Sequence, residues 1–174
     1  MSPARSNRFL LEFWAKAYDA FGEAALPPLG LSPADIDAVL TVEPAVLHLW
    51  AERSDSIVRP RPGLLPALQA QDRDRIATFL ISGCENGPAT TLLPRRANRH
   101  LLTVWRHASG DDEQAGHMAL SSADRAALAM VDELAWHRWI RLPITLAEPR
   151  PGLLPALLAR EEPQLVAFLD SLQR

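Results

Sequence analysis

The sequence predicts a mostly α-helical fold of two tandem helical repeats that form a pseudo-symmetric intramolecular dimer, with one short extended segment or strand per repeat. The first observation is that residues 61–68 and 150–157 both read RPGLLPAL. The second is that apolar residues around both copies recur three and four positions apart, which is the spacing of an amphipathic helix. The third is that the similarity continues in both directions from the identical block.

Downstream of that block, four residues of the first copy match four of the second: Ile76, Phe79, Leu80 and Ser82 match Leu165, Phe168, Leu169 and Ser171. Upstream, His48 and Trp50 match His137 and Trp139 at the same offset. Near the amino terminus the offset grows by two, so that Trp14 matches Trp105. A two-residue deletion in the second copy explains the change. We therefore divide the chain into a first repeat (1–82), a linker rich in Gly and Pro (83–94) and a second repeat (95–174).

Composition narrows the class of protein. A content of 48% hydrophobic and 22% charged residues is typical of a globular protein. The lone Cys84 excludes an intramolecular disulfide, and no apolar run approaches the length of a membrane span, so we expect a cytoplasmic protein. The net charge of −3 argues against a protein that binds nucleic acid on its own.

In the first repeat we expect a loose tail over residues 1–6 and then a helix that Asn7 caps and that ends at Pro27-Pro28 and Gly30. Ser32, Pro33 and Asp35 predict the start of a second helix by a capping box, with Ile36, Val39 and Leu40 buried. A third helix begins at Pro44.

Residues 56–60 alternate weakly and fit either a short strand or an extended crossing, and their prolines restrict them to a sheet edge. Residues 143–146 are the equivalent candidate strand in the second repeat. Two such strands have unpaired edges and can hide them by pairing with each other. Helices are expected over residues 64–70 and after Asp72.

The second repeat follows the same order. Asn98 caps its first helix, residues 110–114 form a polar interruption, and Ser121 or Ser122 caps the next helix. Leu134, Trp136 and Trp139 lie on the third helix, and a final helix begins at Pro163.

The sequence contains no Gly-rich phosphate loop, nucleophile elbow or paired-Cys zinc spacing, so we expect no catalytic residues, no cofactor and no metal. His107, Asp111, Glu113 and His117 come nearest to a metal-binding pattern, but Gly110 favours a solvated polar turn. His48 and His137 are expected on a packing face. Cys84 is read as an idle thiol, with an intermolecular disulfide as the alternative.

Two groups of residues are candidates for packing and recognition. The first is apolar and is expected to form the repeat core or an interface: Trp14, Trp50, Trp105, Trp139, Leu64, Leu65, Leu153 and Leu154. The second is basic, suited to phosphate or an acidic partner, with a solvated face as the alternative: Arg95, Arg96, Arg99, Arg106, Arg59, Arg61 and Arg150.

The first repeat resembles FlhD, the helical subunit of the bacterial flagellar master transcriptional regulator, and its relatives that control mobile elements. The shared features are Asn7 before the apolar Leu10-Leu11, an Ala-rich stretch over residues 20–25, Leu29-Gly30-Leu31 before a polar cap, and Ala51-Glu52 before Ile57-Val58-Arg59. Their order and spacing carry the resemblance, which runs without a gap to about Arg61 and covers roughly a third of the chain.

This chain departs from the family in having two fused units where the family member is one unit that homodimerises. The cysteine that links family dimers falls near Val58, and Ala147 is equivalent in the second repeat, so neither position can form that disulfide. The resemblance implies a helical fold with swapped or paired short segments. It also implies a zinc-bearing FlhC-like partner, on which DNA contact largely depends.

Three functions follow as hypotheses. The first is a transcriptional regulatory subunit that binds DNA only in complex with a partner protein. The second is an interaction module, an anti-activator or adaptor, without DNA binding of its own. The third, an enzyme, requires a polar cleft between the repeats, and the sequence supplies no matched acid, base or nucleophile for it. We expect a monomer with an internal pseudo-dimer, or a dimer of these.

Overall fold

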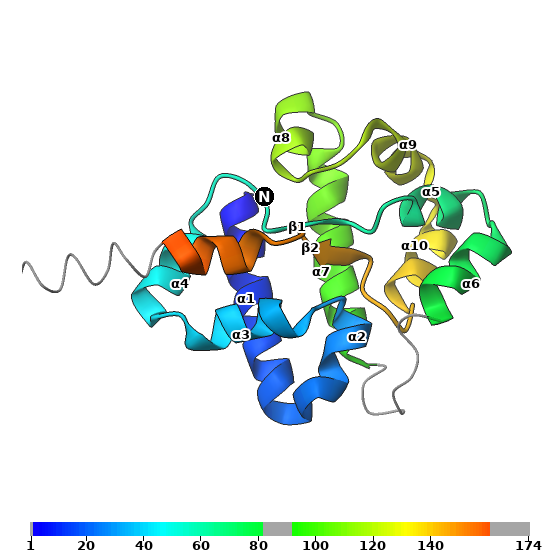
Figure 1. The fold of residues 1–174 in the computed structure, drawn as a ribbon. Coiled ribbons are helices and arrows are strands. Elements are labelled where there is room, and N and C mark those ends of the chain that lie inside the picture. Colours follow the sequence, from blue (N-terminus) through cyan, green and yellow to red (C-terminus); the bar gives the residue numbers. More distant parts are fainter. Residues whose placement is uncertain (1, 82–91, 161–174) are drawn as a thin grey trace, which may run out of the picture.

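The computed structural model describes residues 2–81 and 92–160, and these are mostly helical, as predicted. The expected linker up to residue 91, Cys84 and the expected final helix from Pro163 lie outside the described residues. Two long helices, α1 (Pro3–Phe21) and α7 (Leu92–Ala108), contact each other in the middle of the molecule, and a short two-stranded ribbon crosses them (Figure 1).

α1 begins earlier than predicted. Pro3 lies at its first turn, where a missing N–H costs no hydrogen bond, so residues 3–6 are helical rather than a loose tail. Asn7 is therefore inside the helix and is not its cap. The helix also ends earlier, at Phe21. It is followed by a 3-10 turn (Gly22–Ala25), the short α2 (Leu26–Leu29) and a left-handed Gly30 that terminates α2.

The two helices predicted from Ser caps are both present. α3 (Pro33–Thr41) and α9 (Ser122–Met130) each begin with a complete capping box, made by Ser32 with Asp35 and by Ser121 with Asp124. In each box the Ser side chain accepts from the backbone N–H three residues on, while the Asp carboxylate accepts from the cap residue. Leu40, expected in the core, is instead 47% exposed.

α4 (Pro44–Ala51) and α10 (Glu133–Ile140) follow these helices and pack against α1 and α7 respectively. α5 (Leu64–Gln69) begins within the first copy of the repeated block, and α6 (Arg73–Ile81) follows it. The Asp72 carboxylate caps α6 by accepting from the Arg75 N–H at 3.1 Å. In the second repeat, the helical residues 153–160 likewise begin within the second copy.

α7 begins at Leu92, so residues 92–94 of the predicted linker belong to this helix, and Asn98 is inside it rather than at its start. The predicted polar interruption at residues 110–114 contains the start of a short helix, α8 (Asp112–His117). Asp111 caps α8 by accepting from the Gln114 N–H at 2.9 Å.

The two strands pair with each other, as predicted. β1 (Val58–Pro60) and β2 (Ala147–Pro149) run antiparallel, with Arg59 directly opposite Glu148. The second strand begins later than the predicted 143–146. Ile144, Thr145 and Leu146 approach the ribbon as a buried extended segment, because their backbone groups bond to Asn98 and α2 rather than to a strand.

The repeats share one hydrophobic core. All four candidate Trp residues are buried, with exposed fractions of 2% for Trp14, 1% for Trp50, 0% for Trp105 and 3% for Trp139. Leu64, Leu65 and Leu154 are also buried, and Leu153 is half-buried. α5 of the first repeat contacts α9 of the second, and residues 153–160 lie on the opposite side of the molecule (Figure 1). Elements of the first repeat therefore complete the packing of the second.

Candidate interaction surfaces

Two buried Asn side chains hold the extended segments that lead into the ribbon. The Asn7 amide donates to the Asp55 carbonyl and its oxygen accepts from the Ile57 N–H, both at 2.9 Å. Asn98 makes the equivalent pair of bonds, to Ile144 at 2.9 Å and from Leu146 at 2.8 Å. Each Asn thus satisfies two backbone groups of the extended segment that precedes its strand.

Further backbone bonds across the two repeats occur in reciprocal pairs. The Arg61 N–H donates to Leu146, and the Arg150 N–H donates to Ile57, each at 2.9 Å. The Ser56 N–H donates to the His117 carbonyl, and the Thr145 N–H donates to the Pro28 carbonyl, each at 2.8 Å. These residues occupy equivalent positions in the two repeats. This reciprocity supports the internal pseudo-dimer. That the pseudo-symmetry extends over the whole chain stays an interpretation.

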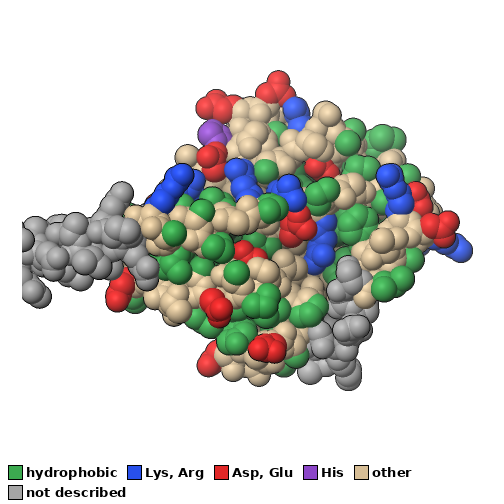
Figure 2. Space-filling view, viewed as in Figure 1, with side chains coloured by type: hydrophobic (Ala, Val, Ile, Leu, Met, Phe, Trp, Pro, Cys, Tyr) green, Lys and Arg blue, Asp and Glu red, His purple; other side chains and the backbone are tan. Residues whose placement is uncertain are grey.

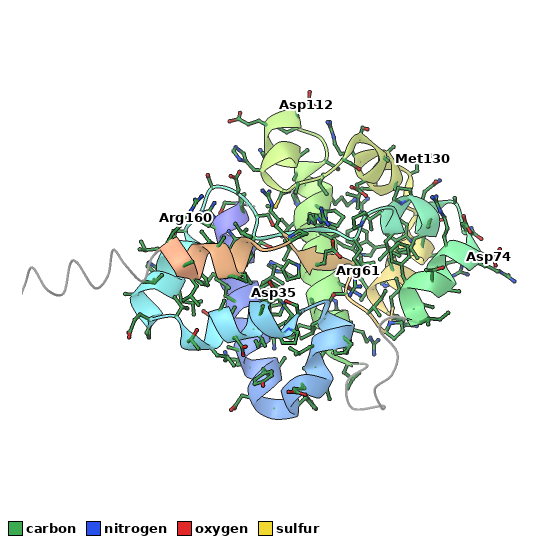
Figure 3. The ribbon with its side chains drawn as sticks, viewed as in Figure 1. Asp35, Arg61, Asp74, Asp112, Met130 and Arg160 are labelled. Atoms are coloured by element: carbon green, nitrogen blue, oxygen red, sulfur yellow. The ribbon has the colours of Figure 1, made fainter. Side chains whose placement is uncertain are left out.

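The three candidate arginines near the ribbon bond within the chain. Arg59 forms an ion pair with Glu148 through Nε at 2.9 Å and Nη2 at 2.7 Å. Arg61 is 9% exposed and its Nε donates to the Thr145 carbonyl at 2.8 Å, and burial lowers the pKa of its guanidinium. Arg150 is half-buried, with Nη2 3.4 Å from the His117 carbonyl. Figure 3 shows Arg61 close to β2, and Figure 2 shows basic side chains flanking an acidic one along the ribbon.

The four candidate arginines of α7 are all exposed. Arg96 lies over the Phe9 ring at 5.7 Å and Arg106 over the Trp136 ring at 5.2 Å. Arg95 and Arg99 form no ion pair within the described residues. α7 contains four Arg and no Asp or Glu, whereas α1 at the equivalent place contains Glu12 and Asp19.

Three of these arginines lie on one face of α7. At about 100° per residue, Arg95, Arg99 and Arg106 fall within about 40° of one another around the helix axis. They extend over about 16 Å along it. We call these three residues the arginine stripe. Their positive charge is not offset by any acidic residue of α7 itself.

A groove opens between the helix pair α5–α6 and the helix pair α9–α10. It has a volume of about 450 Å³. Leu68 and Ile76 line one wall, and Met130, Ala135 and Trp139 line the other. Met130 lies at the end of α9 (Figure 3). Its side chain is 69% exposed, and its sulfur lies 3.8 Å from the Gln69 amide nitrogen on α5. We call this feature the α6–α10 groove.

One ionisable pair joins α8 to the segment before β1. His117 Nδ1 lies 2.7 Å from Asp55 Oδ1. This hydrogen bond is the main cause that raises the pKa of His117 and lowers the pKa of Asp55, and Glu113, 3.8 Å from the ring, raises the His117 pKa further. Arg150 and Arg53 also contribute to the lowered Asp55 pKa.

The other polar candidates occupy separate places. His107 Nδ1 lies 2.7 Å from the Thr103 carbonyl of its own helix. In the part of the chain that the structure describes, no three His, Cys, Asp or Glu side chains are grouped so that they could hold a metal ion. His48 and His137 are exposed, so the expectation that they lie on a packing face is wrong. The reason is that each helix turns its neighbouring Trp, two residues on, into the core instead.

Sequence reasoning missed the α6–α10 groove and the hydrogen bonds by which Asn7 and Asn98 hold the extended segments, which we call the Asn clamps. The sequence predicted Asn7 and Asn98 as helix caps. Their true partners could not be predicted, because these lie more than 40 residues away along the chain. The Arg59–Glu148 pair was detectable, because opposite charges occupy equivalent positions of the two repeats. The groove has no sequence signature of its own, since it depends on α5 and α6 crossing to the other repeat.

None of the helices within the described ranges is both long and apolar enough to cross a membrane. Comparison with models of known protein families, with curated proteins and with solved structures finds no match to this chain.

Proposed function

We propose that this chain is a non-enzymatic transcriptional regulatory subunit of the cytoplasm that binds a partner protein, FlhC-like in kind, to form a promoter-binding complex. The observation that supports this most is the contrast between the two groups of arginines. Those beside the ribbon bond within the chain. The α7 arginines are exposed on a helix without acidic residues, which leaves them available to phosphate.

The electrostatics favour DNA contact only within a complex. With a net charge of −3 the chain as a whole repels a polyanion. Three stripe arginines supply at most about three phosphate contacts, far below the 6–10 of a strong binder. A partner protein therefore has to supply most of the affinity, and the stripe adds a local contact that positions the complex.

The alternative is an interaction module without a DNA role, such as an anti-activator or adaptor. The α6–α10 groove favours it, because a concave surface with a large exposed Met at its edge is suited to a protein ligand. Here the arginine stripe would meet an acidic protein surface rather than phosphate.

A mobility-shift experiment tests the proposal. A candidate FlhC-like protein and a promoter fragment are mixed with wild-type chain and with the variant Arg95→Glu/Arg99→Glu. The matched control is Arg75→Glu/Arg141→Glu, which reverses two exposed charges that are not on α7.

We expect a shift that neither protein gives alone and that the control retains. The stripe variant should weaken the shift by about tenfold or more, and reduce the dependence of log K on log salt by roughly two units. Loss of a shift that the partner gives alone supports the anti-activator alternative. A stripe variant that behaves as wild type contradicts a phosphate contact at α7.

A further inference from the structure

The α6–α10 groove has partly uncovered apolar residues on both of its walls. α6 buries none of its residues, and Ile76 on it is only half-buried. On the facing side Met130 is 69% exposed, and Val131 and Ala135, which also line the groove, are half-buried. A contiguous group of large exposed apolar residues around a groove marks an interaction site more often than isolated surface residues do.

The charged residues that line this groove are two Arg and one Asp. Arg73 on α6 and Arg138 on α10 line it from opposite walls, and neither forms an ion pair within the described residues. Asp132 also lines it, but its carboxylate caps α10 by accepting from the Ala135 N–H at 2.7 Å. Within the described residues, two guanidinium groups without an ion pair therefore lie on opposite walls of a partly apolar groove, and the Asp132 carboxylate leaves a net positive charge there.

We propose that the α6–α10 groove binds an amphipathic helix of the partner protein, whose apolar face contacts Ile76, Ala135 and Met130 and whose flanking acidic residues pair with Arg73 and Arg138. This inference deepens the proposed function and rests on it for the existence of a partner.

A helix is the ligand geometry that the walls favour. The groove lies between two helices, α6 and α10, and an amphipathic helix that enters such a groove buries one apolar stripe while its charged edges stay at the rim. Arg on both walls matches acidic residues on both edges of that stripe, and Met130 supplies a side chain that adapts its shape to the ligand.

The groove also depends on the pairing of the repeats. α5 and α6 belong to the first repeat, α9 and α10 to the second, and α5 contacts α9 directly. A ligand can therefore bind in the groove only when the two repeats are paired. The arginine stripe does not depend on this pairing, because all three of its residues lie on α7.

The test uses fluorescein-labelled amphipathic peptides and the full chain. One 18-residue peptide carries Leu on one face and Glu on its flanks, and a second carries Lys in place of every Glu. Fluorescence anisotropy is measured with wild type, with Met130→Asp and with Arg73→Glu/Arg138→Glu. Matched controls are Leu40→Asp, an exposed apolar residue on α3 that does not line the groove, and Arg75→Glu on α6. Circular dichroism establishes that each variant is folded.

We expect the acidic peptide to bind wild type and both controls alike, and the basic peptide to bind at least tenfold more weakly. Met130→Asp and the double Arg variant should each weaken the acidic peptide by roughly tenfold or more, and the double Arg variant should improve binding of the basic peptide. Equal binding of both peptides, no binding of either, or equal loss in the controls overturns the proposal. If the groove results hold but no mixture shifts DNA, the proposed function fails while the groove remains a binding site for an acidic amphipathic helix.

Discussion

The side-chain oxygen of Asn98 accepts a hydrogen bond from the backbone N–H of Leu146 at 2.8 Å, and both residues are buried. The amide of the same Asn donates to Ile144. A helix in the centre of the molecule thereby fixes the segment that enters β2, and Asn7 does the same for the segment that enters β1. The ribbon that joins the two repeats depends on these two side chains.

Replacing Asn98 by Ala should destabilise the fold by about 2–4 kcal/mol, because two buried backbone groups lose their partners at once. Asn7→Ala should have a similar effect. Urea unfolding measures both. Thr103→Ala on the same helix removes only an exposed bond to the Arg99 carbonyl and should change the free energy of unfolding by less than about 0.5 kcal/mol. A small loss for Asn98→Ala would show that the clamp does not contribute to stability.

Truncation of Trp50 or Trp139 to Ala should cost about 3–5 kcal/mol each, since both rings are almost fully buried. Thermal unfolding monitored by circular dichroism checks this. Trp136→Ala is the matched control on α10, because that ring is only half-buried and contacts Arg106. Unchanged stability together with lost binding of a partner would place Trp50 and Trp139 on an interface instead.

Gly30→Ala should destabilise more than Gly152→Ala. Both glycines have a positive φ, 71° and 69°, so both substitutions strain the backbone by about 1 kcal/mol or more. A Cβ at Gly30 would also lie 2.7 Å from Arg61 Nη2 and 3.1 Å from the Ala147 carbonyl, whereas nothing lies within 4 Å at Gly152. The difference between the two variants in urea unfolding isolates this crowding. Equal losses would mean that Arg61 moves aside without cost.

The ion pair between His117 and Asp55 predicts a pH-dependent stability. Its raised His117 pKa adds stability that is fully present below the usual value of 6.5 and is lost as pH rises through the folded pKa. The lowered Asp55 pKa adds stability that is present above 3.8 and is lost as pH falls through its folded pKa. Both groups therefore favour the fold between these values.

We expect His117→Gln to lose more stability at about pH 5 than at about pH 8.5, measured by urea unfolding at each pH. His107→Gln is the control, because that ring contacts a carbonyl of its own helix. A loss for His117→Gln that is the same at both pH values would contradict the charged pair.

The sequence was most informative where structure depends on neighbouring residues. The capping boxes at Ser32 and Ser121 are local, so their helices could be predicted together with their starts. The pairing of the two strands followed from the repeat, because equivalent edges can cover each other. Helix amphipathicity likewise placed Trp50 and Trp139 on buried faces.

The predictions were wrong where the role of a residue depends on a partner that is distant in the sequence. Asn7 and Asn98 have the composition of helix caps, yet they bond to segments that approach from elsewhere in the fold. Leu40 has the spacing of a core residue but lies 47% exposed near the end of the nine-residue helix α3. The roles of Arg59 and Arg61 could not be separated from those of Arg95 and Arg99, because composition does not tell which guanidinium meets a carboxylate or carbonyl of the same chain.

The internal pairing of the repeats can be measured by a single cross-link. In a Cys84→Ser background, Arg59→Cys and Glu148→Cys place two thiols directly opposite each other on β1 and β2. Facing residues of a hydrogen-bonded antiparallel pair have Cα atoms about 5.5 Å apart, which suits a disulfide. On mild oxidation we expect a disulfide within one 19.2 kDa chain, formed equally well at every dilution. Covalent dimers alone, disappearing on dilution, would show that the strands pair between chains and would contradict the account.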